Sequence, residues 1–77
     1  MTVIHNKIKH LRKIKGISQQ ELADYLGIER TSLSKIENMK YNPSARIISE
    51  TSNFFNLPIG DIFFNLSVSS NDTKKVI

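Results

Sequence analysis

Cysteine is absent from the sequence, and glycine and proline are scarce, at 3 and 2 residues. Without thiols the chain can form neither a disulfide nor a thiolate zinc site, and His5 and His10 cannot complete a metal site alone. We therefore predict no metal and no cofactor. Scarce glycine and proline, together with 39% hydrophobic residues, are typical of a folded chain rather than a disordered one.

The sequence also lacks any apolar run near the ~18 residues that a membrane span needs, and its start lacks the apolar block of a signal peptide. We therefore expect a cytoplasmic protein without a membrane partner. Its 77 residues correspond to one small domain with a modest core.

Acidic residues are missing from the first twenty positions, although the net charge of the chain is only +4. The same segment holds five basic residues: Lys7, Lys9, Arg12, Lys13 and Lys15. Such an excess suggests a polyanionic partner, either nucleic acid or an anionic membrane surface. A solvated face would give the same pattern, so charge alone does not decide.

Apolar spacing predicts a series of helices. In residues 6–15, Ile8, Leu11 and Ile14 form one stripe, and Gly16 is placed to end that helix. Ser18 and Glu21 form a capping box for a helix over residues 19–26.

Gly27 should end the second helix, and Glu29 can then accept hydrogen bonds at the start of a third helix that ends near Asn38. After Ser44 comes a fourth helix with a wide apolar face, which Asn56 should end. A short fifth helix is expected over residues 59–63.

Beyond the fifth helix, Phe64, Leu66 and Val68 alternate with polar residues, as in a half-buried strand. Residues 1–4 are the other short β-prone run, so the two ends could pair with each other or across a dimer, or the tail could fray. We predict an all-α, five-helix domain over residues 1–66 with a small β-ribbon. Residues 67–77 form a tail that is partly disordered or supplies a dimer strand.

Two helices joined at Gly27, the second with a polar outer face, form a helix-turn-helix pattern over residues 18–38. Over about residues 6–63 the chain resembles the lambda-repressor-like (Cro/repressor, XRE-type) helix-turn-helix family. The motifs that carry this resemblance are Leu11-Arg12, Gly16-Ile17-Ser18-Gln19, Glu21-Leu22-Ala23, Leu26-Gly27-Ile28, Leu33-Ser34-Lys35-Ile36-Glu37, Asn42-Pro43-Ser44, Leu57 and Asp61-Ile62-Phe63.

The resemblance implies that the helix after Glu29 enters the major groove of double-stranded DNA. The residues it assigns to base reading are Arg30, Thr31, Ser34 and Lys35. Those it assigns to the DNA backbone are Gln19, Ser32, Asn38, Lys40, Tyr41 and Arg46. It further implies that Arg12 and Glu37 form a structural ion pair, and that Gln19 braces the recognition helix as well as holding a phosphate.

The sequence departs from the family pattern at Met39, where glycine is usual. If the backbone there needs a positive φ, methionine costs about 1 kcal/mol or more. A different loop path would move Asn38 and Lys40, so their assignments depend on this residue. Ser49, Thr51 and Ser52 also stand where the family is commonly apolar or small.

These features predict a homodimeric, sequence-specific transcriptional regulator that binds an inverted-repeat operator, with residues 57–68 as the dimer interface. A repressor is favoured over an activator because so short a chain holds no separate effector domain. The alternative is an antitoxin or anti-regulator that binds a partner protein. We expect no enzymatic activity and no small-molecule ligand, and we expect the protein to be associated with the nucleoid.

Overall fold

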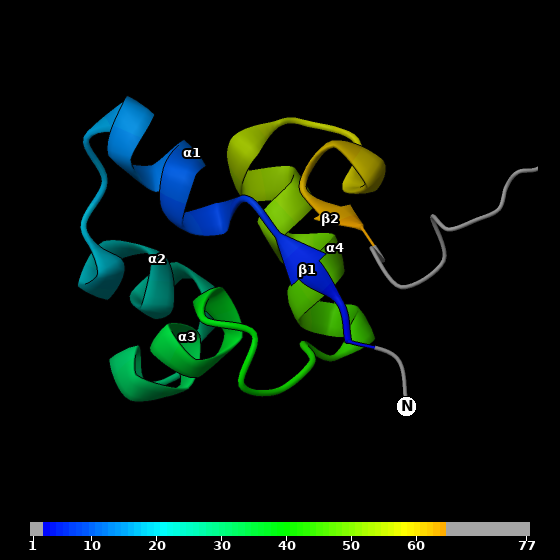
Figure 1. The fold of residues 1–77 in the computed structure, drawn as a ribbon. Coiled ribbons are helices and arrows are strands. Elements are labelled where there is room, and N and C mark those ends of the chain that lie inside the picture. Colours follow the sequence, from blue (N-terminus) through cyan, green and yellow to red (C-terminus); the bar gives the residue numbers. More distant parts are fainter. Residues whose placement is uncertain (1–2, 65–77) are drawn as a thin grey trace, which may run out of the picture.

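Four α-helices, one 3₁₀ helix and two short strands make up the part of the chain that the computed structural model describes, residues 3–64 (Figure 1). In chain order they are β1 (His5–Asn6), α1 (Ile8–Lys15), α2 (Gln19–Leu26), α3 (Arg30–Glu37), α4 (Ala45–Phe55), η1 (Ile59–Asp61) and β2 (Phe63–Phe64). No helix among the described residues is long and apolar enough to cross a membrane.

All four α-helices end in the same way, with a residue in the left-handed region of φ. Gly16 and Gly27 have φ of 69° and 71°, and Asn56 has φ of 56°. In each case the next residue donates its N–H to a carbonyl five positions back, as Ile17 does to Arg12 at 2.9 Å. The left-handed residue also donates its own N–H, to the carbonyl three positions back. The two bonds together satisfy carbonyls that a helix end leaves unpaired. The predicted helix ends at these three residues are confirmed.

Met39 supplies the fourth left-handed residue, with φ of 58°. Its N–H reaches the carbonyl of Ile36 at 3.1 Å, and the N–H of Lys40 reaches that of Lys35 at 2.8 Å. The loop after α3 thus follows the path that glycine usually permits, but with a methionine. Strain of about 1 kcal/mol is stored at this position, because a β-carbon crowds the backbone there.

The starts of the helices were predicted less accurately than their ends. The capping box of Ser18 and Glu21 is present, with bonds of 2.9 and 3.0 Å, and the Ser44 side chain accepts from Ile47. The predicted cap at Glu29 is wrong, because its side chain makes no capping hydrogen bond. Glu29 instead contributes its backbone carbonyl, which accepts from Leu33.

The core lies where the four helices and the C-terminal turn meet. Its buried side chains are Ile8, Leu22, Ala23, Leu26, Leu33, Ile36, Ile47, Phe55, Ile62 and Phe63. Ile14 was predicted to belong to this face but is 66% exposed. Residues spaced by three drift about 60° per step around a helix, so Ile14 has turned away from Ile8, and Arg12 is buried in its place.

The predicted fifth helix is wrong in type and extent. Only Ile59–Asp61 is helical, as a 3₁₀ turn, and Phe63 already belongs to β2. The turn is held by i to i+3 bonds, and the carbonyl of Ile62 accepts from the N–H of Lys7 at 2.9 Å. That bond to the N-terminal segment takes the carbonyl that a continuing helix would use.

The β-ribbon between the two ends is present, but its strands are shorter than predicted and one is displaced. His5 pairs with Phe64 and Asn6 with Phe63, in antiparallel register within one chain. The first strand therefore follows residues 1–4 rather than coinciding with them, and Asn6 belongs to it instead of α1. Predictions for residues 65–77 lie outside the described part of the chain.

Replacing Gly27 by alanine tests the left-handed helix ends, because a β-carbon there would meet no atom within 4 Å. The cost should come from φ alone, about 1 kcal/mol, which lowers Tm by roughly 4–8 °C in a domain of this size. Gly60→Ala is the matched control, since Gly60 is equally open and has no positive φ. Equal melting temperatures for the two variants would contradict the argument.

Candidate nucleic-acid interface

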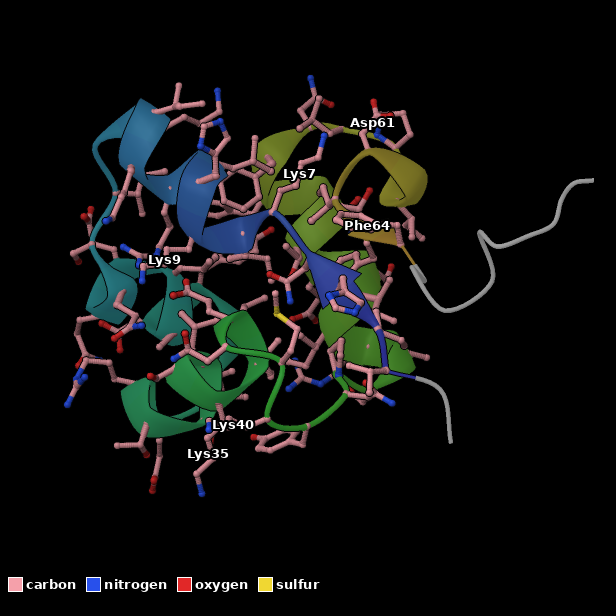
Figure 2. The ribbon with its side chains drawn as sticks, viewed as in Figure 1. Lys7, Lys9, Lys35, Lys40, Asp61 and Phe64 are labelled. Carbon is pink, nitrogen blue, oxygen red and sulfur yellow. The ribbon has the colours of Figure 1, made fainter. Side chains whose placement is uncertain are left out.

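α3 buries one side and presents the other to solvent. Leu33, Ile36 and Glu37 are buried, whereas Arg30, Thr31 and Lys35 are exposed and Ser34 is half-buried. Lys35 points away from the bundle (Figure 2). The four predicted base-reading residues therefore share one outer face of α3, and we call them the recognition surface.

A buried ion pair fixes the end of α3 to α1. Arg12 Nε lies 2.7 Å from Glu37 Oε2, and Arg12 Nη2 lies 3.1 Å from Glu37 Oε1. The two side chains are only 10% and 1% exposed. The third guanidinium nitrogen donates to the carbonyl of Ile17 at 3.1 Å, so the pair also holds the turn between α1 and α2. The structure has the geometry predicted for a structural ion pair here.

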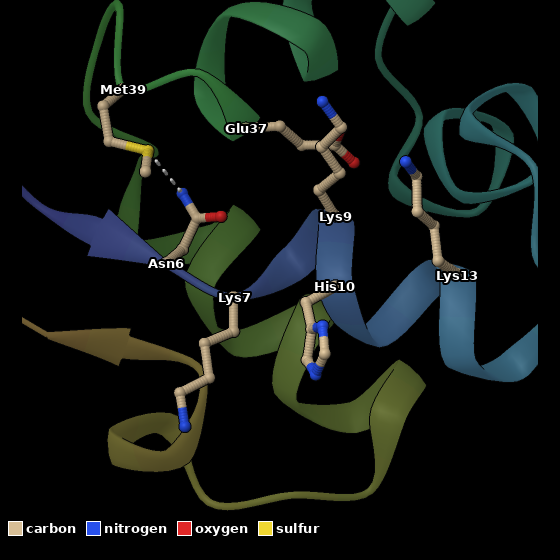
Figure 3. Close-up of a pocket in the computed structure, with 7 residues that line it drawn as sticks. All are labelled: Asn6, Lys7, Lys9, His10, Lys13, Glu37 and Met39. Carbon is tan, nitrogen blue, oxygen red and sulfur yellow. Dashed lines mark hydrogen bonds between the residues drawn. The ribbon is translucent and has the colours of Figure 1, made fainter.

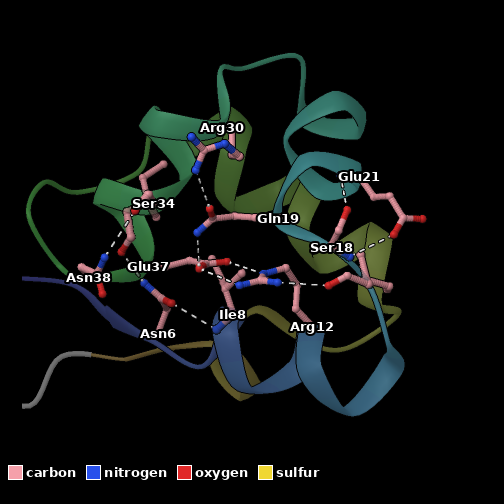
Figure 4. Close-up of polar contacts among 12 residues, drawn as sticks. Asn6, Ile8, Arg12, Ser18, Gln19, Glu21, Arg30, Ser34, Glu37 and Asn38 are labelled. Carbon is pink, nitrogen blue, oxygen red and sulfur yellow. Dashed lines mark hydrogen bonds and ion pairs between the residues drawn. The ribbon is translucent and has the colours of Figure 1, made fainter.

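Gln19 extends this pair to the recognition surface (Figure 4). Its Nε2 donates to Glu37 Oε1 at 3.0 Å, and its Oε1 accepts from Arg30 Nη1 at 3.2 Å. A continuous chain of polar contacts thus runs from Arg12 in the core to Arg30 on the outside. The bracing role predicted for Gln19 fits these contacts, but the sequence did not indicate that Arg30 is itself a partner.

Asn6 makes a second set of polar contacts that hold the end of α3, and this role was not predicted from the sequence. It is 9% exposed, its Nδ2 donates to the carbonyl of Ile36 at 2.9 Å, and its Oδ1 accepts from the N–H of Ile8 at 3.1 Å. Asn6 therefore joins the start of α1 to the end of α3. The signal available was an asparagine just before a helix, where its side chain commonly accepts from the first turn.

The predicted backbone residues fall into two groups. Asn38, Lys40 and Tyr41 are exposed where the chain leaves α3, and Asn38 Nδ2 lies 3.4 Å from Ser34 Oγ. Ser32 is half-buried on α3, at the side of the recognition surface. These residues lie next to the recognition surface, and their contacts with DNA stay a prediction.

The guanidinium of Arg46 is engaged with α2 and with its own helix. Its guanidinium donates to the carbonyl of Leu26, at the end of α2, at 3.0 Å and to Glu50 at 2.7 Å. The Arg46 and Glu50 side chains are 54% and 37% exposed, so this is a surface pair within α4. In the structure Arg46 therefore joins α4 to the end of α2.

Comparison with known proteins supports the same reading. A family model described as helix-turn-helix matches residues 8–62. An uncharacterized HTH-type transcriptional regulator of Methanocaldococcus jannaschii is 38% identical over 58 residues, which cover 75% of this chain and 88% of that protein. The ImmF control region 10 kDa protein of Bacillus phage phi105 is 44% identical over 52 residues, 68% of this chain and 58% of that protein.

Among solved structures, the N-terminal DNA binding domain of SinR from Bacillus subtilis matches with a TM-score of 0.61 and 35% identity, over 69% of this chain and 78% of that one. The chain belongs to the XRE-type helix-turn-helix family of DNA-binding transcriptional regulators. The relative from Methanocaldococcus jannaschii is described as a transcriptional regulator, in agreement with the class of protein expected from the sequence.

Glu37→Gln should destabilise the fold by about 3–5 kcal/mol, because it leaves the buried Arg12 charge without its counter-ion. The matched control is Glu50→Gln, which removes the exposed partner of Arg46. A surface pair at this helical spacing contributes only about 0.3–0.5 kcal/mol. Urea unfolding of both variants measures the difference, and similar losses would show that the buried pair is not the stronger contact.

Proposed function

We propose that this protein is a sequence-specific transcriptional repressor that binds an inverted-repeat operator as a homodimer, with α3 in the major groove. The observation that carries the proposal is the exposed polar face of α3, held from behind by the contacts of Arg12, Glu37 and Gln19. An α-helix is about 10–12 Å across, and the major groove is about 12 Å wide, so this face can reach base edges.

Arg30 is the strongest candidate for direct base reading. Its guanidinium can donate to O6 and N7 of one guanine, which discriminates against other bases by about 1–3 kcal/mol. The hydrogen bond that Arg30 donates to Gln19 Oε1 limits the orientations that the guanidinium samples, so less entropy is lost on binding. Thr31 can contact a thymine methyl group, and Lys35 can reach a guanine or a phosphate.

The second group of residues gives affinity and register with little base information. Gln19 is at the start of α2, where backbone N–H groups and the helix dipole favour a phosphate. Lys40 and Tyr41 are suited to the phosphate backbone beyond the end of α3. Ser32 and Asn38 flank them, whereas Arg46 would have to leave Leu26 and Glu50 to join.

Dimerisation follows from the size of the reading unit. One recognition helix covers only a few base pairs, and paired half-sites about 34 Å apart are how such domains gain specificity. The proposed interface spans residues 57–68. In its described part Ile59 is 47% exposed, and Phe64 is half-buried with its ring 6.1 Å from that of His5. A dimer on an operator would act most simply by blocking polymerase.

Selection of bound duplexes from a random pool tests the proposal as a whole. We expect enrichment of an inverted repeat whose half-sites are about one helical turn apart, and a dimer by analytical ultracentrifugation of the complex. A pool with no enriched motif, together with tight capture of one partner protein, would favour the antitoxin or anti-regulator alternative.

Arg30→Ala tests the base-reading assignment on the selected operator. Affinity should fall by about 1–3 kcal/mol, and discrimination at one base pair should be lost while binding to random duplex is little changed. Thermal unfolding should stay close to wild type, because Arg30 is exposed. An equal loss on operator and random DNA would assign Arg30 to the backbone instead.

A further inference from the structure

A pocket of about 420 Å³ lies between the first turns of α1 and the end of α3 (Figure 3). Its lining is basic on the α1 side. The lining residues include Lys7, Lys9, His10, Lys13, Glu37 and Met39. None of them is among the residues assigned above to DNA. The volume is sufficient for a small charged group and its hydration water.

Among residues 3–64 the lysines of this pocket have no counter-ion. Within residues 3–64 no ion pair or hydrogen bond is made by the side chains of Lys7, Lys9 and Lys13. Glu37 does not neutralise them, because its carboxylate is already paired with Arg12 at 2.7 Å. The pocket therefore carries an excess of positive charge that an anion would relieve.

Lys9 and Lys13 are four residues apart on α1, so their side chains lie on one face of the helix (Figure 3). Like charges at this spacing destabilise a helix by about 0.2–0.5 kcal/mol. Nothing in the fold compensates this cost, since neither side chain has an acidic partner in the described part of the chain. A bound anion bridging the two amines would do so.

The pocket adjoins the recognition surface through Glu37, whose carboxylate is also bonded to Gln19 and, through it, connected to Arg30. A duplex with α3 in its groove has a phosphate strand on each side of that helix.

We propose that Lys9 and Lys13 form a phosphate-binding site for the DNA backbone, beside the base pairs that α3 reads. The inference rests on the proposed function, because it places the duplex by α3. The site adds affinity and fixes the angle at which α1 meets the duplex, and it carries no base specificity. A free phosphorylated small molecule has the same chemistry and is separated from DNA by the experiment.

Single variants Lys9→Gln and Lys13→Gln are compared with Lys15→Gln, an exposed lysine of the same helix outside the pocket. All three lose one positive charge, so non-specific attraction changes equally. Loss of a phosphate contact makes the negative slope of log K against log salt shallower by about 0.9, which corresponds to a roughly fivefold loss of affinity near 0.15 M salt. We expect this for Lys9→Gln and Lys13→Gln, on operator and random duplex alike, and not for Lys15→Gln.

The position of the contact is tested by replacing single operator phosphates with uncharged methylphosphonates. At one or two positions flanking a half-site, the substitution should lower the affinity of the wild-type protein about fivefold. The affinity of Lys9→Gln should not fall further at those positions. Independent losses at every position would overturn the inference. A second result would also overturn it: the wild-type protein binds pyrophosphate at constant ionic strength, Lys9→Gln abolishes that binding, and no methylphosphonate position is coupled to Lys9.

Failure of the proposed function gives a different result. If no operator is enriched but random duplex still shows the lysine-dependent salt slope, sequence-specific regulation is rejected and the phosphate site stands. If an operator is enriched and the three lysine variants behave alike, the regulator proposal stands and the phosphate site is rejected.

Discussion

The ion pair between Arg12 and Glu37 is the contact on which the arrangement of the other elements depends. One guanidinium holds the last turn of α3, through Glu37, and the turn between α1 and α2, through the carbonyl of Ile17. Charges removed from water are tolerated only when nearly all their hydrogen-bonding capacity is used, and here the carboxylate accepts from Arg12 and Gln19 together. The two helices of the helix-turn-helix are therefore joined by a directional contact as well as by apolar packing.

This has a consequence for the outer surface. Gln19 and Asn6 each contact the last turn of α3, Gln19 at the carboxylate of Glu37 and Asn6 at the carbonyl of Ile36. The helix proposed to enter the groove is held at that end by polar contacts from α1, α2 and β1. A rigid support of this kind reduces the entropy lost when a side chain such as Arg30 engages a base.

Local sequence signals were enough to predict α2 and α4, because each has an N-terminal side-chain cap and a left-handed residue at its end. The same signals did not predict the C-terminal segment, where the hydrogen bond from Lys7 to Ile62 and the pairing of His5 with Phe64 decide the conformation. These are contacts between distant parts of the chain. Ile14 was misassigned for a geometric reason, since a spacing of three does not stay on one side of a helix over two turns. For the site, family motifs supplied the residues of the recognition surface, whereas the links from Gln19 to Arg30 and from Asn6 to Ile36 needed coordinates.

The N-terminal strand joins the fold next to the loop that follows α3. The N–H of Ile4 donates to Asn42 Oδ1 at 2.9 Å, and Asn6 reaches the end of α3 two residues later. Any polypeptide fused ahead of this strand would enter the domain beside Lys40 and Tyr41. A purification tag at that end would therefore lie on the side of the molecule that we propose for contacts with the DNA backbone, and binding assays are better made with that end unmodified.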